Sequence, residues 1–232
     1  RRPPRSTLSS SSAASDVYKR QTYGNAFMLR TDSDKKLNEF KKYSKIPIIN
    51  GLSPSSHPTQ VLSDIFTIQE IKNKNISKLK ICWIGDANNN MMNSLIEACI
   101  KFSISLNIAC PKDYQPNKAL ISMIKKQKGK IKIFNNKEKA VKNSDVVMTD
   151  KIISLNDKVN KKKKLKSFKN FKVDTKTMNL AKKDAIFLHC LPRGSEVTEE
   201  VFLGKQSKVW QQALNRVYVQ KSILLYCFGK LR

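Results

Sequence analysis

Two short motifs hold the side chains of this chain that are best suited to chemistry. They contain its only two histidines: His-Pro-Thr-Gln at residues 57–60 and His-Cys-Leu-Pro-Arg-Gly at residues 189–194. The second motif places an imidazole, a thiol and a guanidinium directly after the apolar run 185–188. A parallel strand delivers polar groups in this way to its carboxyl edge, where open α/β sheets bind ligands. For either motif alone, the alternative is a hydrogen-bonded core histidine beside an ordinary buried cysteine. Two such motifs in one chain favour a binding or catalytic site.

Polar clusters also follow two other apolar runs. The sequence Gly-Asp-Ala-Asn-Asn-Asn at residues 85–90 follows one run, and Thr149 with Asp150, and Ser154 soon after, follows another. Each cluster alone has an alternative in turn formation and helix capping, and the asparagine turn lacks the GxGxxG pattern of dinucleotide sites. Because parallel strands end at the same edge of a sheet, we expect the clusters to converge. Their amide, carboxylate and hydroxyl groups suit a zwitterionic amino acid.

Strands and helices alternate along the part of the chain that must position these groups. Apolar spacing predicts strands at 26–29, 46–50, 80–86, 105–110, 130–134, 145–149 and 185–190, and helices at 34–44, 57–72, 91–102, 116–128, 138–143, 176–182 and 215–228. This alternation predicts an α/β fold with a doubly wound parallel sheet. His57 and Gln60 would then share one face of the first turn of a helix, where free backbone N–H groups favour an anion.

The charge and cysteine content exclude several classes of function. The chain carries 45 Lys and Arg against 18 Asp and Glu, yet has no arginine between Thr31 and Pro192. Since base readers depend on arginine forks, we expect no nucleic-acid partner, and we expect the lysine run 161–164 to be a solvated loop. No apolar stretch approaches the roughly 20 residues of a membrane span, so we expect no membrane association. The cysteines form no CxxC pair, which argues against a zinc site and favours a reducing cytoplasm.

Residues 1–21 differ from the rest of the chain. They hold a Pro-Pro pair and a serine run, without an apolar period that could pack. The stretch 12–21 resembles the translation of a sequencing adapter. We therefore expect a non-native or disordered leader outside the fold, and a native gene that extends upstream.

Five stretches, in this order, resemble an ornithine carbamoyltransferase, a member of the aspartate/ornithine carbamoyltransferase family. They lie at residues 57–60, 83–90, 144–150, 189–197 and 215–221, and the His-Cys-Leu-Pro sequence is the most specific of them. The resemblance covers about the carboxyl-terminal two-thirds of such an enzyme. It implies a remnant of an α/β carbamoyl-phosphate-binding domain at 22–74, a Rossmann-like ornithine-binding domain at 75–214, and a carboxyl-terminal helix at 215–232 that returns to the first domain.

The resemblance also implies an activity. The family member would transfer a carbamoyl group from carbamoyl phosphate to the δ-amine of L-ornithine, giving L-citrulline and phosphate for arginine biosynthesis. It would act as a cytoplasmic homotrimer and need no metal or organic cofactor. Two alternatives stay open: a carbamoyltransferase for a related amine, such as putrescine or an acylated ornithine, and a non-catalytic binding protein.

The family's site residues can be carried over onto matching positions. The resemblance implies that carbamoyl phosphate is bound by His57, Gln60, Cys190, Leu191 and Arg216. It implies that ornithine is bound by Asn89, Asn90, Asp150, Ser154 and Leu155. The residues implied in catalysis are Cys190, Asp150, Arg216 and His57, with the Arg216 guanidinium stabilising negative charge on the carbonyl oxygen.

The chain departs from the family pattern at three places. The family's Ser-Met-Gly loop reads Ser-Leu-Asn at 154–156, and Leu214 stands where a glutamate is usual. The Ser-Thr-Arg-Thr-Arg phosphate loop is absent from the sequence. We also expect the arginine that follows this loop in the first domain to be missing. Without them the phosphate would lose most of its contacts, so we expect the chain as given to be incomplete and inactive or nearly so.

Overall fold

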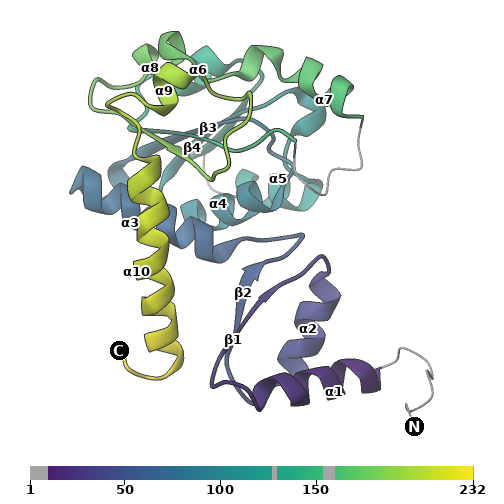
Figure 1. Cartoon of the computed structure of the whole chain (residues 1–232). Coiled ribbons are helices and arrows are strands. Elements are labelled where there is room, and N and C mark those ends of the chain that lie inside the picture. The colour runs from purple at the N-terminus through teal and green to yellow at the C-terminus, as the bar shows by residue number, and fades with distance from the viewer. Residues whose placement is uncertain (1–9, 127–129, 154–159, 232) are drawn as a thin grey trace.

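The computed structural model describes residues 10–126, 130–153 and 160–231 (Figure 1). The helices are α1 Ser10–Gln21, α2 Asp34–Tyr43, α3 Pro58–Lys72, α4 Asn90–Lys101, α5 Lys118–Lys125, α6 Lys137–Val141, α7 Lys161–Ser167, α8 Thr175–Leu180, α9 Glu199–Phe202 and α10 Val209–Cys227. The strands are β1 Phe27–Arg30, β2 Ile48–Leu52, β3 Lys80–Ile84, β4 Ser105–Ala109, β5 Ile131–Phe134, β6 Val146–Thr149 and β7 Ile186–His189. Short 3-10 turns lie at Ile76–Lys78, Lys112–Tyr114 and Lys169–Phe171.

The larger sheet has five parallel strands in the order β5-β4-β3-β6-β7. The chain enters this sheet at β3, adds β4 and β5 on one side of it, and then adds β6 and β7 on the other side. This is the doubly wound arrangement that the alternating pattern predicts, and the prediction of an α/β fold with a parallel sheet is confirmed. The strand order reverses between β3 and β6, which is where open α/β sheets form ligand crevices.

Alternate side chains of each strand enter two separate cores. In β3, Ile81 and Trp83 join a cluster with apolar residues of α3, α4 and α5, while Cys82 and Ile84 join a cluster with residues of α6, α8 and α9. Since successive side chains of a strand point to opposite faces, helices cover both faces of this sheet. The strands are therefore mostly apolar, and Figure 1 shows helices on both sides of the sheet.

A smaller unit precedes this sheet, with β1 and β2 paired in parallel and α1 and α2 packed beside them. The sequence predicts that residues 1–21 do not pack, and for residues 10–21 this is wrong. In α1 the Val17 side chain is 3 % exposed, and the Gln21 side-chain carbonyl accepts a hydrogen bond from the Lys45 backbone N–H at 3.0 Å. Val17 packs without a long apolar period along the helix, which is why the sequence pattern did not indicate it. Residues 1–9 lie outside the described residues, and the non-native origin of the leader stays a prediction.

Two further elements differ from the sequence-based expectation. The lysine run 161–164 forms most of α7 instead of a solvated loop, because the Asn160 side chain caps the helix at the Lys163 backbone N–H. The carboxyl-terminal helix begins at Val209 instead of Asn215, since Val209 and Gln212 are already buried. The division of the chain at residues 74 and 214 stays a prediction.

Helix α10 packs along α3 and then extends beyond the large sheet, as its yellow ribbon shows in Figure 1. The Asn215 side chain is fully buried and donates hydrogen bonds to the Thr67 hydroxyl at 3.0 Å and to the Glu70 carboxylate at 2.9 Å. In the described ranges, none of the helices combines the length and apolar character that a membrane crossing needs.

Candidate active site

Three strand ends bring polar groups to one edge of the large sheet. Asp86 follows β3, Asp150 follows β6 and Cys190 follows β7, and all three strands run in the same direction. The Thr149 hydroxyl donates to the Ile84 carbonyl at 2.6 Å and so fixes β6 against β3 at this edge. Between them Gly85 has φ +149°, and a Cβ there would lie 3.3 Å from the Thr149 hydroxyl oxygen. L side chains rarely adopt this backbone conformation, and the close approach leaves little room for a Cβ, so both favour glycine at this position.

Helices α3 and α10 bring two of the predicted carbamoyl-binding side chains into direct contact. The Gln60 side chain, 3 % exposed, donates through Nε2 to Asp64 Oδ1 at 2.8 Å. Its carbonyl oxygen Oε1 accepts a hydrogen bond from the Arg216 guanidinium. His57 caps the start of α3, and its backbone N–H donates to the Ser94 hydroxyl at 2.8 Å. The amino end of α3 is thereby held against both α4 and α10.

The His57 imidazole is neutral at neutral pH. Its pKa is lowered from 6.5 to about 4, mainly by burial and in addition by the positive charges of Arg216 and Arg30. Arg30, the last residue of β1, is a residue that sequence reasoning missed, although it comes at the end of an apolar run as Asp150 and Cys190 do. The expectation that the chain has no first-domain arginine at the site is therefore wrong, because Arg30 acts electrostatically on His57.

Cys190 and Asp150 share an environment that disfavours negative charge. Burial raises the pKa of the Cys190 thiol well above its usual range, and the carboxylates of Asp150 and Asp64 raise it further against the opposing effect of Arg216. Burial also raises the pKa of Asp150, while a hydrogen bond from the Lys151 backbone N–H, at 2.7 Å, opposes that shift. Cys190 is therefore a neutral thiol beside a carboxylate and a guanidinium.

His189 is a hydrogen-bonded core histidine, which is the alternative that the sequence analysis gave for this motif. Its ring is 1 % exposed, with Nε2 2.8 Å from the Glu196 carboxylate. Because Nδ1 accepts a hydrogen bond from the Leu191 backbone N–H at 2.9 Å, the ring hydrogen lies on Nε2 and points to Glu196. This arrangement holds Leu191 in a left-handed conformation, with φ 39°, directly after Cys190. The histidine shapes the turn that presents Cys190 and the Leu191 backbone.

The asparagine turn has clear structural roles. The Asn89 carbonyl oxygen caps α4 at the Met92 backbone N–H at 2.8 Å, and its amide nitrogen donates to the Asp86 carbonyl at 3.1 Å. The Asn90 amide nitrogen donates to the Ser53 carbonyl at 2.9 Å, which ties α4 to the loop after β2. Ser154 and Leu155, the other predicted ornithine contacts, lie outside the described residues.

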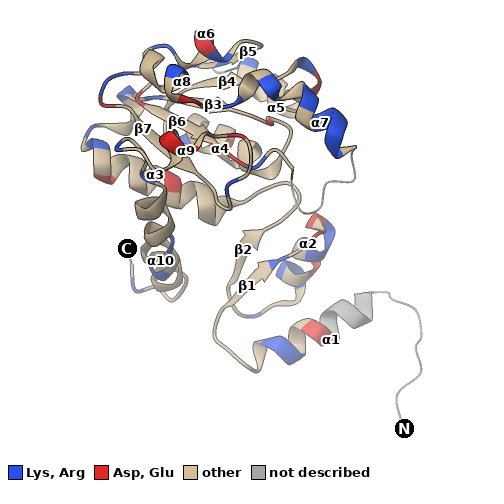
Figure 2. Ribbon diagram, turned by 45° about the horizontal axis from the view of Figure 1, so that its top comes forward, with Lys and Arg blue, Asp and Glu red and all other residues tan. Residues whose placement is uncertain are grey.

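A buried ion pair closes the same edge of the sheet from α7. Lys164 Nζ lies 2.6 Å from Asp86 Oδ2, with side-chain exposures of 5 % and 8 %, and 5.6 Å from the centre of the Tyr114 ring. Figure 2 shows basic residues along α7, and Lys164 is the one that turns inward. A run of four identical residues carries no signal that distinguishes this lysine.

Asp64 and Gln212 were also missed by the sequence analysis, although Gln60/Asp64 and Gln212/Arg216 are each spaced by four residues, one turn of a helix.

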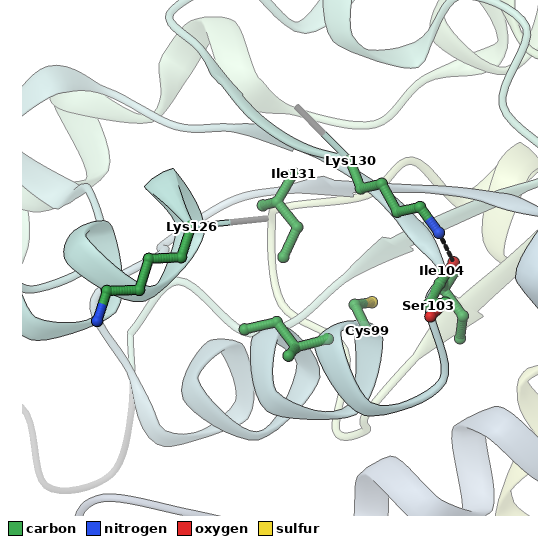
Figure 3. A pocket seen from close by; sticks show the side chains of 7 residues that line it. Cys99, Ser103, Ile104, Lys126, Lys130 and Ile131 are labelled. Atoms are coloured by element: carbon green, nitrogen blue, oxygen red, sulfur yellow. Dashed lines mark hydrogen bonds between the residues drawn. The ribbon is translucent and has the colours of Figure 1, made fainter. Parts of the chain in front are cut away.

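A cavity of about 200 Å³ lies at the opposite edge of the sheet, and Figure 3 shows the side chains that line it. It is formed near the starts of β4 and β5 and the ends of α4 and α5, and is lined by Cys99, Ile100, Ser103, Ile104, Lys126, Lys130 and Ile131. Its position separates it from the convergent polar groups. In the part of the chain that the structure describes, His, Cys, Asp and Glu side chains form no group that could hold a metal ion.

Comparison with known protein families identifies two matching domain models. Residues 7–70 match the aspartate/ornithine carbamoyltransferase carbamoyl-P binding domain, and residues 77–227 match the aspartate/ornithine carbamoyltransferase Asp/Orn binding domain. The first match includes part of the segment that sequence reasoning placed outside the fold.

Similar curated proteins and solved structures agree with these domain matches. The chain is 42 % identical to an ornithine carbamoyltransferase of Caldicellulosiruptor saccharolyticus, over 90 % of this chain and 70 % of that protein. It is 40 % identical to one of Methanocorpusculum labreanum, over 88 % of this chain and 67 % of that protein. The anabolic ornithine carbamoyltransferase structure from Campylobacter jejuni superposes with a TM-score of 0.86 at 37 % identity, covering 94 % of this chain and 74 % of that one. The Pyrococcus furiosus enzyme gives a TM-score of 0.86 at 34 % identity, covering 95 % and 72 %.

Proposed function

This chain belongs to the aspartate/ornithine carbamoyltransferase family, and on that premise we propose that its site transfers a carbamoyl group from carbamoyl phosphate to the δ-amine of L-ornithine. The products are L-citrulline and phosphate, in the direction of arginine biosynthesis. The observation that carries the proposal is the hydrogen bond between Gln60 and Arg216. The Arg216 charge also acts on the pKa of His57, and the charges of Arg216 and Asp150 act on the pKa of Cys190. The similar proteins named ornithine carbamoyltransferase support ornithine as the acceptor.

The carbamoyl group is bound between α3 and α10. Gln60 Oε1 accepts from the carbamoyl NH₂, and the Leu191 backbone lies beside it. Arg216 and the neutral His57 ring bind the carbonyl oxygen. As the amine attacks the carbonyl carbon, this oxygen gains negative charge that the guanidinium stabilises. The C–O bond to phosphate then breaks, and the amine proton leaves with the phosphate.

The amino acid is bound at the carboxyl ends of the strands. Asp150 binds the α-ammonium group, and Asn89 and Asn90 lie on the carboxylate side. Cys190 contributes a neutral thiol next to the reacting amine, and the buried surroundings favour the uncharged amine that can attack. Contacts from Ser154 and Leu155 stay a prediction.

The phosphate is the least well supported ligand of this chain. The sequence has no Ser-Thr-Arg-Thr-Arg stretch, and the arginines near His57 are Arg30 and Arg216. We therefore propose that the chain by itself forms citrulline slowly, because the two arginines replace only part of a phosphate cradle. A cytoplasmic homotrimer without cofactor, nucleic acid or membrane partner also stays a proposal, drawn from sequence and resemblance.

Citrulline formation from ¹³C-labelled carbamoyl phosphate tests the function, with mass spectrometry to detect slow turnover. L-Ornithine is compared with putrescine and an acylated ornithine, and Arg216→Met serves as the inactive control. A product only with ornithine that Arg216→Met abolishes supports the proposal. A faster rate with putrescine would move the function to a related amine. Absence of product together with absence of ornithine and carbamoyl phosphate binding by calorimetry would leave a non-catalytic binding protein as the better account.

A further inference from the structure

Asp64 is a buried carboxylate that the proposed chemistry does not use. It lies one turn after Gln60 on α3, is 0 % exposed, and its Oδ1 accepts two side-chain amide hydrogen bonds. One comes from Gln60 Nε2 at 2.8 Å and the other from Gln212 Nε2 at 2.7 Å. The two amides belong to different helices that meet at this carboxylate.

We propose that Asp64 is a positioning residue for the carbamoyl group, because its carboxylate fixes the orientation of the Gln60 amide and, through Gln212, the position of the strand end at His189. The inference rests on the proposed function, since Gln60 matters here as the acceptor for the carbamoyl NH₂. Asp64 acts through Gln60 and Gln212.

An ionised carboxylate can only accept hydrogen bonds, and this property orients both amides. Gln60 must turn its nitrogen to Asp64, so its carbonyl oxygen points the other way, to Arg216. Gln212 must do the same, so its carbonyl oxygen accepts the His189 backbone N–H at 2.9 Å. A neutral amide in place of Asp64 would offer a donor as well as an acceptor, and either glutamine could then flip.

The charged groups around Asp64 indicate that its role is orientation more than stability. Its pKa is raised to about 6, because burial and, more weakly, the Asp150 charge outweigh the opposing effects of the two amides and Arg216. Asp64 Oδ2 has no hydrogen-bond partner within the described ranges of the chain. A neutral residue of the same shape would be buried more easily. What the ionised group adds is a pure acceptor.

The first test observes the two glutamines directly, without any ligand. In the unmodified chain, the NMR signals of the Gln60 and Gln212 side-chain NH₂ groups and the His189 backbone N–H are followed from pH 8 to pH 5. Gln60→Ala and Gln212→Ala variants assign the glutamine signals. We expect these signals to shift together with one midpoint near pH 6, and the shift to disappear in Asp64→Asn. Glutamine signals that stay constant while Asp64 titrates would overturn the proposal.

The second test measures binding of phosphonoacetamide, which carries a carbamoyl-like amide and a phosphonate. Asp64→Asn is expected to weaken binding about tenfold, the size of one misaligned hydrogen bond, and to have no further effect in a Gln60→Ala background. Ser63→Ala is the matched control, since it removes one buried hydrogen bond from the same helix without touching Gln60. Equal losses from Asp64→Asn with and without Gln60 would contradict the proposal.

The two tests separate the inference from the function on which it rests. If the unmodified chain fails to bind phosphonoacetamide, the proposed function loses support, and the NMR titration alone decides whether Asp64 orients the glutamines. If Asp64→Asn does not fold, the titration of the unmodified chain still gives the same decision.

Discussion

Replacement of Lys164 by methionine would leave the Asp86 carboxylate buried without its lysine. Methionine keeps most of the apolar stem of the side chain and removes the ammonium group. Asp86 would keep the hydrogen bond from the Asn88 backbone N–H to Oδ1, at 2.9 Å. The change therefore tests the buried charge pair more than the packing of α7.

The magnitude follows from the distance and burial of the pair. At 2.6 Å and an effective dielectric constant of about 20, the Coulomb attraction is about 6 kcal/mol. Part of it offsets the desolvation of two charges that are 5 % and 8 % exposed. Loss of one partner from such a pair destabilises by about 3–5 kcal/mol, and this is the loss expected for Lys164→Met.

Urea unfolding, followed by tryptophan fluorescence and circular dichroism, measures this loss. The neighbouring exposed Lys163→Met is the matched control and should change the free energy of unfolding by less than about 0.5 kcal/mol. Asp86→Asn combined with Lys164→Met should lose much less than the two single variants together, because the double variant leaves no unpaired charge. A Lys164→Met variant as stable as Lys163→Met would refute the reasoning.

The remaining predictions concern buried titratable groups and one glycine. Since folding raises the pKa of Asp64 from 3.8 to about 6, the chain loses stability as pH rises through this window. In urea unfolding, Asp64→Asn should be about 3 kcal/mol more stable than the unmodified chain at pH 8 and equal to it near pH 3.5. Folding lowers the pKa of His57 from 6.5 to about 4, so stability should fall as pH drops through that window, and His57→Gln should reduce the fall in urea midpoint. Iodoacetamide at pH 8, with peptide mapping, should label Cys227 well before Cys190, whose thiol pKa is raised. Gly85→Ala should lower the free energy of unfolding by about 1–3 kcal/mol, because alanine is strained at φ +149°.

Prediction of the large sheet succeeded because its strands are buried on both faces. β3 is apolar after its first residue, Lys80, and β6 is apolar up to its last residue, Thr149; short runs of this kind between helical segments indicate parallel strands. The predictions for α1 and α7 were wrong for the same physical reason. Val17 in α1 and Lys164 in α7 turn inward, and what each of them packs against or pairs with lies elsewhere in the chain. Local composition does not contain that information.

The structure brings together several of the side chains that the sequence singled out, from strand ends and from helices α3 and α10. Gln60 and Arg216 are in direct contact, and Cys190 and Asp150 lie in one electrostatic environment at the predicted edge. The sequence could not reveal how these groups are held, because the supporting contacts join helices that are far apart in the chain. Asp64 could have been found only from its spacing to Gln60, a spacing that many solvent-exposed helical pairs also have.

The interface between α3 and α10 explains why polar side chains are buried where apolar ones would be more stable. A purely apolar contact between two helices tolerates sliding, and a slide of one turn would move Arg216 by about 5.4 Å and separate it from Gln60. The Gln212–Asp64 bond at 2.7 Å and the Asn215–Thr67 bond at 3.0 Å can form together in only one register of the two helices. Shifting the register would leave these buried groups without partners, which is strongly unfavourable. The buried polar contacts therefore specify the position of Arg216, and with it the geometry of the site.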